Sequence, residues 1–244
     1  MTDLLYQSDS YLREADARVT GHTEINGAPA VMIDRTVLYP GGGGQPADLG
    51  VLHWDGAQAA VVRAAKQGED VAYALDGLLP AVSAAVRMTV DWERRYRLMR
   101  THTAMHCLCG TVFRDCGALV TGGQMDLDRS RMDFELEDLS PERVAAIERA
   151  ANAAIAADLP VRVRILPRDE AFAIPDLIRT KINLLPPGIA QVRTVEIVGL
   201  DLQADGGTHV AHTGEVGGIR IVGTRSKGKS NKRLEIALID TQTT

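Results

Sequence analysis

The chain of 244 residues has no recognisable segment that would direct it out of the cell or into a membrane. Its N-terminus, MTDLLYQSDSYLREAD, lacks a basic region followed by an apolar run, so we predict no secretory signal. No stretch of about 18 apolar residues occurs, which argues against a membrane-spanning helix. Cysteine is scarce as well: the 3 cysteines lie within one short stretch, and an odd, local set excludes a disulfide framework. We therefore expect a cytoplasmic protein in a reducing compartment, with no membrane partner.

The overall composition is that of an ordinary globular protein, with 45% hydrophobic and 24% charged residues. It excludes a disordered chain and a collagen. The formal net charge of −5 is unevenly distributed. Residues 1–90 carry 6 basic and 11 acidic side chains, whereas residues 91–244 carry 21 of each. A nucleic acid is therefore expected to prefer the later part of the chain.

Residues 1–90 are predicted to form short strands separated by turns. Asp55-Gly56 and Asp76-Gly77 are typical turn pairs, and each follows an apolar segment. The apolar segments lie at residues 28–38, 51–54, 57–62, 71–75 and 87–90. Several short strands at this spacing indicate a barrel or a sandwich, and we assign residues 1–90 to a small β-barrel domain.

The pattern changes at Asp91, which can cap a helix over residues 92–109, a stretch without proline or glycine. Ser140 and Pro141 suit the start of a second helix, whose apolar positions follow a 3.6-residue period and which ends before Pro160. Further strands are predicted at residues 161–166, 191–198, 219–223 and 234–239. We therefore expect an α+β fold, in which residues 91–244 form a domain with long helices and a mainly antiparallel sheet.

Two pairs of side chains indicate a metal site. His102 and His106 are four residues apart in the predicted helix, so both imidazoles lie on one face. Asp205 and His209 are also four apart, around Gly206-Gly207, and glycine lets such a loop fold tightly. We expect these residues to form a tetrahedral zinc site, and nitrogen and oxygen donors favour a catalytic over a structural site. The alternative is that the two helical histidines are simply polar surface residues.

The nearby cysteines are predicted to lie outside this site. Cys109 is seven residues after His102. At a rise of about 1.5 Å per residue, the two Cα atoms are therefore about 10 Å apart along a helix. Three ligands from one straight helix cannot easily converge on one ion. We predict that Cys107, Cys109 and Cys116 are small buried apolar groups.

In this order and spacing, the motifs resemble those of a known family. His102-Thr103-Ala104-Met105-His106 and Gly206-Gly207-Thr208-His209 resemble the editing domain of alanyl-tRNA synthetases and the free-standing alanyl-tRNA editing deacylases. The glycine-rich stretch from Asp34 to Gly50 resembles a third motif of that family. The resemblance covers nearly the whole chain, which leaves no room for a synthetase catalytic domain. We therefore expect a stand-alone editing protein of the medium-length type.

The resemblance implies an activity and a cofactor. Family members hydrolyse the ester between a wrong amino acid and the 3′ end of tRNA(Ala), usually serine and sometimes glycine. It also implies Zn²⁺ held by His102, His106, Asp205 and His209, which either activates water or positions and polarises the substrate. Many members have a cysteine where this chain has Asp205, and a carboxylate is a harder, weaker zinc ligand than a thiolate. A three-histidine site with water is the alternative.

The resemblance also implies substrate contacts. Gln45 is expected to orient the water or the substrate, and the hydroxyl of Thr36 to recognise the serine side chain. Backbone amides of Gly42, Gly43 and Gly44 are expected to contact the terminal adenosine or the oxyanion, and Thr208 completes the substrate-binding set. A plain wide turn is the alternative for the glycines.

Contacts with RNA phosphates are expected from two basic segments. One is the loop at residues 225–233, above all Arg225, Lys227 and Lys229, which we predict to be a mobile arm. The other is the arginine run of the first helix, which comprises Arg94, Arg95, Arg97 and Arg100. The alternative interpretation of each segment is a charged surface that only keeps the protein soluble.

Two other functions remain open at this point. One is a non-catalytic tRNA-binding module with a structural metal, which Asp205 in place of a thiolate favours. The other is a metal-dependent hydrolase of some other ester, which leaves the basic segments unexplained. The His102/His106 pair, Gln45 and the complete glycine loop favour the editing enzyme.

Overall fold

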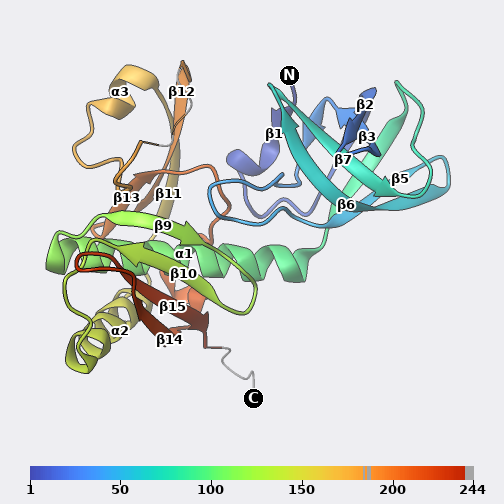
Figure 1. Ribbon diagram of the computed structural model, residues 1–244. Coiled ribbons are helices and arrows are strands. Elements are labelled where there is room, and N and C mark those ends of the chain that lie inside the picture. The colour runs from blue at the N-terminus through green and yellow to red at the C-terminus, as the bar shows by residue number, and fades with distance from the viewer. Residues whose placement is uncertain (184, 186–187, 240–244) are drawn as a thin grey trace. The chain divides into compact units, whose positions relative to one another are not determined.

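The computed structural model describes residues 1–183, 185 and 188–239, and it forms two compact units (Figure 1). The first unit comprises Met1–Arg97, and the second begins at Leu98. The boundary therefore falls inside the helix α1 (Trp92–Cys116), whereas the sequence places it just before that helix. Within the described residues, no helix combines the length and the apolar character needed to cross a membrane.

The first unit is a closed barrel, as predicted. Six strands follow one another around it in the order β2-β3-β7-β6-β5-β8, and all neighbours are antiparallel. Val31, Leu52, Tyr73 and Met88 are fully buried in its core. The strands are β2 (Glu14–Ile25), β3 (Ala28–Ile33), β5 (Gly50–Trp54), β6 (Ala57–Gln67), β7 (Asp70–Asp76) and β8 (Ala85–Val90). Two short parallel strands, β1 (Asp3–Leu4) and β4 (Arg35–Thr36), and the 3-10 helix η1 (Leu5–Gln7) complete the unit.

Two features of the barrel differ from the sequence prediction. The strand β2, with 12 residues, was not predicted, because only Ala17, Val19 and Ile25 of it are buried and the rest is largely polar. The strand predicted over residues 28–38 ends at Ile33. The remaining residues of that segment lead through β4 into the glycine-rich loop.

The glycine-rich loop needs glycine for its backbone conformation. Gly41, Gly42, Gly43 and Gly44 all have positive φ, at 88°, 131°, 57° and 89°. Gly42 and Gln45 exchange backbone hydrogen bonds, with the Gly42 N–H donating at 3.1 Å and the Gln45 N–H at 2.9 Å. The two central residues, Gly43 and Gly44, therefore have the positive φ values of a type I′ turn. L-residues with side chains rarely adopt that conformation.

A buried ion pair holds the segment that carries this loop. The guanidinium of Arg95, in the first turns of α1, is fully buried and donates from Nε to Asp48 Oδ2 at 2.8 Å. It also donates from Nη1 to the carbonyl of Ser10 at 3.0 Å and from Nη2 to that of Val37. The same Asp48 oxygen accepts from the Tyr39 amide at 2.6 Å. Arg95 thereby joins both ends of the loop segment to α1.

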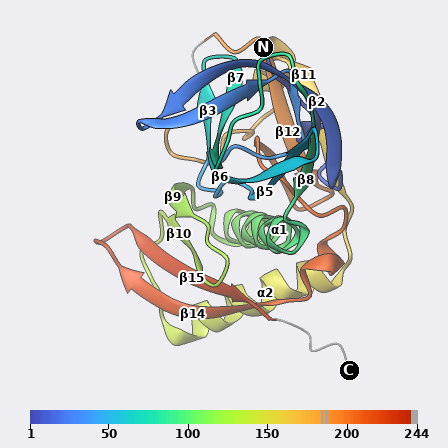
Figure 2. The ribbon, with the colours of Figure 1, turned by 90° about the vertical axis from the view of Figure 1, so that its right-hand side faces the viewer.

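The second unit is built from helices and two antiparallel sheets. One sheet has the order β14-β15-β10-β9 and the other β11-β12-β13. Figure 2 shows the four-stranded sheet beside α1, and Gly123 of that sheet lies against Met105 of the helix. The strands are β9 (Val120–Gln124), β10 (Ser130–Phe134), β11 (Val161–Pro167), β12 (Gln191–Ile197), β13 (Asp201–Ala204), β14 (Ile219–Ser226) and β15 (Lys232–Leu238). The α+β class is thus confirmed.

The helices of this unit follow their sequence signals in part. The helix α2 (Pro141–Ala156) begins as predicted, with Ser140 accepting a hydrogen bond from the Arg143 amide. The helix α1 continues past the predicted end at residue 109, because Gly110 stays helical and packs closely against Leu200 and Asp201. The short helices α3 (Arg168–Phe172) and η2 (Thr213–Val216) and the strands β9, β10 and β13 were not predicted.

The variant Arg95→Met should destabilise the first unit by about 3–5 kcal/mol, because it leaves the buried carboxylate of Asp48 without its partner. Both tryptophans, Trp54 and Trp92, lie in this unit, so their fluorescence during urea unfolding measures the change. Arg87→Met is the matched control, since Arg87 pairs with Glu14 at the surface and its loss should change little. Equal losses for the two variants would contradict the structural role of Arg95.

Candidate metal centre

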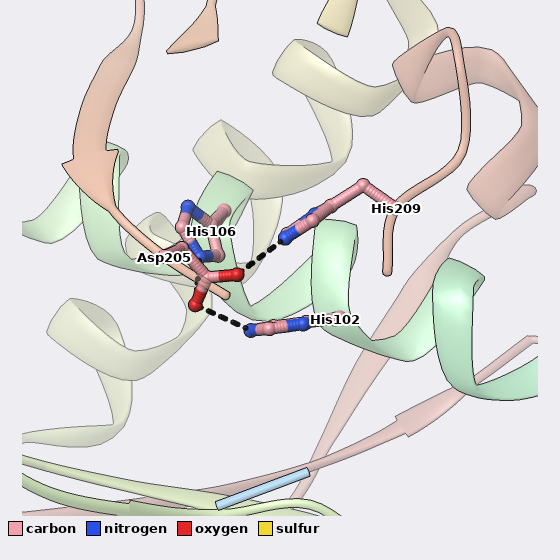
Figure 3. Close-up of side chains that lie close together, drawn as sticks. All are labelled: His102, His106, Asp205 and His209. Carbon is pink, nitrogen blue, oxygen red and sulfur yellow. Dashed lines mark hydrogen bonds and ion pairs between the residues drawn. The ribbon is translucent and has the colours of Figure 1, made fainter. Parts of the chain in front are cut away.

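The four predicted ligands come together in the second unit (Figure 3). His102 and His106 lie one turn apart on α1, and Asp205 and His209 lie in the segment that follows β13. One potential ligand atom from each residue lies within 4.8 Å of the others. All three histidines are buried. The alternative of a surface histidine pair is therefore wrong.

The carboxylate of Asp205 is surrounded by the three imidazoles. Its Oδ2 lies 3.4 Å from His102 Nε2 and 3.9 Å from His106 Nε2, and its Oδ1 lies 3.2 Å from His209 Nε2. In each ring it is therefore Nε2 that faces the common centre. Three nitrogens and one carboxylate oxygen converge as the sequence predicts.

Hydrogen bonds on the far side of two rings hold them in this orientation. His106 Nδ1 lies 2.9 Å from Asp201 Oδ2, and His209 Nδ1 lies 3.1 Å from the hydroxyl of Thr103. Sequence reasoning missed both partners. The alternation of Asp201, Gln203 and Asp205 is the signal that was available, because alternate residues of a strand share a face, but no strand was predicted there.

Backbone contacts fix the position of Asp205. Its Oδ1 accepts from the Gly207 amide at 2.7 Å, and its carbonyl accepts from Arg193 Nη1 at 2.9 Å. The sequence predicts that this turn needs the conformational freedom of glycine. Neither Gly206 nor Gly207 has a positive φ, so the backbone of the turn does not require glycine for that reason. The short contact to the Gly207 amide directs the carboxylate toward the histidines instead.

Burial and charge set the protonation states of the centre. Burial raises the pKa of Asp205, but the charge of His102 and hydrogen bonds with all three histidines outweigh burial and hold that pKa well below its usual range. Burial and the neighbouring His102 and His106 depress the pKa of His209 well below its usual range. Burial alone lowers the pKa of His106, but the bonds to Asp201 and Asp205 raise it to about 9. Before a metal ion binds, the centre thus presents an ionised carboxylate, a neutral His209 and a protonated His106 near neutral pH.

The donor set fits a divalent metal ion. Imidazole nitrogens and a carboxylate oxygen are ligands that Zn²⁺ takes in tetrahedral sites, and here four of them converge in a buried position. The thiols do not compete, because burial raises the pKa of Cys107 to about 12 and that of Cys109 further, and the thiolate is the ligand form. Cys107 and Cys109 are buried as predicted, whereas Cys116 is exposed and that prediction is wrong.

Comparisons with known proteins identify the family. A family model described as the threonyl and alanyl tRNA synthetase second additional domain matches residues 192–235, which include Asp205 and His209. The alanyl-tRNA editing protein AlaX-M of Methanosarcina acetivorans is 40% identical over 98% of this chain and 100% of its own length. The chain belongs to the family of alanyl-tRNA editing proteins.

Other relatives agree with this assignment. The AlaX-M protein of Saccharolobus solfataricus is 39% identical over 96% of this chain and 98% of its own length. The alanine–tRNA ligase of Pyrobaculum neutrophilum is 40% identical over 89% of this chain but only 25% of the ligase. This editing protein therefore matches whole stand-alone relatives and a quarter of a much larger ligase.

The predicted substrate contacts of the editing protein lie partly in its barrel. The hydroxyl of Thr36 is fully buried, accepts from the Leu38 amide at 2.9 Å and lies 2.7 Å from the hydroxyl of Tyr73. Gln45 is also buried, while Gly42, Gly43 and Gly44 are exposed. Thr208, in the second unit, is fully buried. Their contacts with a substrate remain predictions.

The basic loop is less free than the sequence indicates. Lys227 Nζ donates to Asp133 at 2.9 Å, and Arg233 Nε donates to it at 2.7 Å. The hydrogen bond with Arg233, and to a smaller extent the one with Lys227, lowers the pKa of Asp133 to about 2. Lys232 is buried and donates to Ser226 Oγ and to two backbone carbonyls of the loop. These bonds close the loop, where the sequence predicts a mobile arm.

The basic loop and the arginine run of α1 differ in the exposure and pairing of their cations. Within the part of the chain that the structure describes, no ion pair involves Arg225 or Lys229, and both are exposed. In the arginine run, Arg95 is fully buried against Asp48, so its predicted contact with RNA is wrong. Arg100 donates to the carbonyl of Val216 at 2.9 Å.

Replacing His209 by alanine should weaken Zn²⁺ binding by more than about 100-fold, because it removes a proposed ligand. Loss of a residue that only hydrogen-bonds to a ligand typically weakens metal binding by roughly 10- to 100-fold. Competition with a chromophoric chelator measures the change. His212→Ala is the matched control, since His212 is three residues further on, exposed and outside the cluster. Retained affinity in His209→Ala would show that this cluster is not the metal site.

Proposed function

We propose that this protein is a trans-editing deacylase that hydrolyses the ester of tRNA(Ala) mischarged with serine or glycine. The observation that carries the proposal is the buried centre of His102, His106, Asp205 and His209. The full-length similarity to alanyl-tRNA editing proteins supplies the substrate class. These four residues would hold Zn²⁺ as the resident ion.

When bound, Zn²⁺ would supply a Lewis acid that lowers the pKa of a water molecule or polarises the ester carbonyl. The protein's own contribution is orientation. Thr103 holds the ring of His209, and the Gly207 amide directs the Asp205 carboxylate. Because the three histidines are buried and Asp205 is mostly buried, few solvent molecules surround the centre, and electrostatic effects are stronger there than in water.

Selectivity for serine is assigned to Thr36 and orientation of the water or the substrate to Gln45. The hydroxyl of Thr36 is held by Leu38 and Tyr73 and therefore has a defined direction. A site built to bond a substrate hydroxyl discriminates against a substrate that lacks it, because its own polar group is then left unpaired. This property would spare correctly charged Ala-tRNA(Ala).

Recognition of the tRNA backbone is assigned to Arg225 and Lys229 rather than to the whole basic loop. Lys227 and Arg233 already pair with Asp133, which stays ionised near neutral pH because its pKa is about 2. Arg225 and Lys229 are the exposed cations of this loop for which phosphates would be partners. The backbone amides of the exposed residues Gly43 and Gly44 are assigned to the terminal adenosine or the oxyanion.

The purified protein should hydrolyse Ser-tRNA(Ala), lose this activity on chelation and regain it when Zn²⁺ is added back. Release of radiolabelled serine measures the rate, and Ala-tRNA(Ala) should be spared. His209→Ala is the inactive control. No hydrolysis at saturating Zn²⁺ would leave a non-catalytic tRNA-binding module, and hydrolysis of free small esters in preference to aminoacyl-tRNA would indicate another hydrolase.

The double variant Arg225→Gln/Lys229→Gln should raise KM for the tRNA with little change in kcat, because phosphate contacts contribute binding. The slope of log KM against log salt concentration should fall by about 1–2 units. The matched control removes two exposed arginines of the barrel, Arg35→Gln/Arg63→Gln, and changes the net charge equally. If both pairs shift KM alike, the effect is one of net charge and the assignment is wrong.

A further inference from the structure

The carboxylate of Asp201 is the most enclosed charged group near the centre. Its side chain is fully buried, next to the proposed ligand His106. Oδ2 lies 2.9 Å from His106 Nδ1 and accepts from Gln203 Nε2 at 2.7 Å. Oδ1 lies 3.6 Å from Arg179 Nε. Burying a carboxylate is costly unless charged or polar partners compensate.

Three features of the chain accommodate this carboxylate. Gly110 lies in the middle of α1, and a Cβ there would be 2.9 Å from the Cβ of Asp201. Glycine inside a helix costs roughly 0.5–1 kcal/mol relative to alanine, so the position is used for close approach. Gln203 bridges Asp201 and Cys109, donating to the sulfur at 3.3 Å. Arg179 stacks over Phe113 at 3.6 Å, which keeps its charge beside the carboxylate.

The contact with His106 decides which ring nitrogen is available. To ligate a metal ion, His106 must give up one proton and become a neutral imidazole, which carries its remaining proton on one nitrogen and offers a lone pair on the other. A carboxylate at Nδ1 holds the proton there, so the lone pair lies on Nε2, the atom that faces Asp205. Carboxylate partners of this kind orient metal-bound histidines and strengthen them as ligands.

We propose that Asp201, held by Gln203 and Arg179, is a positioning residue that directs Nε2 of His106 at the metal. This inference rests on the proposed metal site but not on the identity of the substrate. It assigns Gln203 and Arg179 an indirect role, through the carboxylate that they fix. Asp201 itself is not a ligand, because its oxygens contact Nδ1 rather than the centre.

The test measures Zn²⁺ affinity by chelator competition, without tRNA, in the full-length protein. Asp201→Asn should weaken Zn²⁺ binding about 10- to 100-fold. The same substitution should have no further effect in a His106→Asn background, because Asp201 acts through His106. An asparagine at 106 keeps an amide near the position of Nδ1 but has no Nε2. Unchanged affinity in Asp201→Asn, or an equal loss in both backgrounds, would overturn the proposal.

Asp158→Asn is the matched control, since Asp158 lies 3.8 Å from Nδ1 of His212 at the surface and its loss should leave Zn²⁺ affinity unchanged. If Asp201→Asn does not fold, Gln203→Met takes its place and should show a smaller loss that also disappears with His106→Asn. Binding of Zn²⁺ without hydrolysis of Ser-tRNA(Ala) would contradict the proposed function only. A wild-type protein that binds no Zn²⁺ would overturn both proposals.

Discussion

The second unit depends on the close approach of β13 to one face of α1. His102, His106 and Gly110 are spaced by four residues, so they form a continuous stripe along that face. At Gly110 the absence of a side chain lets Leu200 and Asp201 come against the helix. Four residues further along the chain, Asp205 therefore arrives beside the two histidines. A larger residue at position 110 would push the strand away and separate the ligands that the centre needs.

Two buried ionic clusters in this protein have opposite characters. In the first unit, the guanidinium of Arg95 donates hydrogen bonds to Asp48 and to backbone carbonyls. These bonds close the cluster and hold the segment of the glycine-rich loop in place. In the second unit, Asp205 faces three imidazoles whose Nε2 atoms all point inward. Such an arrangement of donors is favourable when a cation occupies the middle of it. The difference lies mainly in geometry, since Arg95 and Asp48 are fully buried and the second cluster is mostly buried.

Pairing among charged side chains also reduces the number of cations that are available for the proposed tRNA contacts. The later part of the chain contains equal numbers of acidic and basic residues, and the basic loop stands out in the sequence. In the structure, Asp133 engages Lys227 and Arg233, and the amine of Lys232 is bonded to the loop itself. The cations that remain available are therefore fewer than the sequence contains. Electrostatic binding of a tRNA depends on those unpaired charges.

The sequence by itself determined the features that depend on local periodicity and turn chemistry. It predicted the barrel of short strands, the start of α2 at Ser140 and the common face of His102 and His106. It also contains the motifs that resemble the editing family. The long strand β2 could not, because only Ala17, Val19 and Ile25 of its residues are buried.

Only the tertiary structure decided which elements meet. The packing of separate elements brought Asp201 to His106, Thr103 to His209, and Arg95 to the buried carboxylate of Asp48. Spacing along a chain defines which side chains share a face of one helix or strand. It does not define which other element packs against that face, and the contacts of Asp201 with His106 and of Thr103 with His209 depend on that packing.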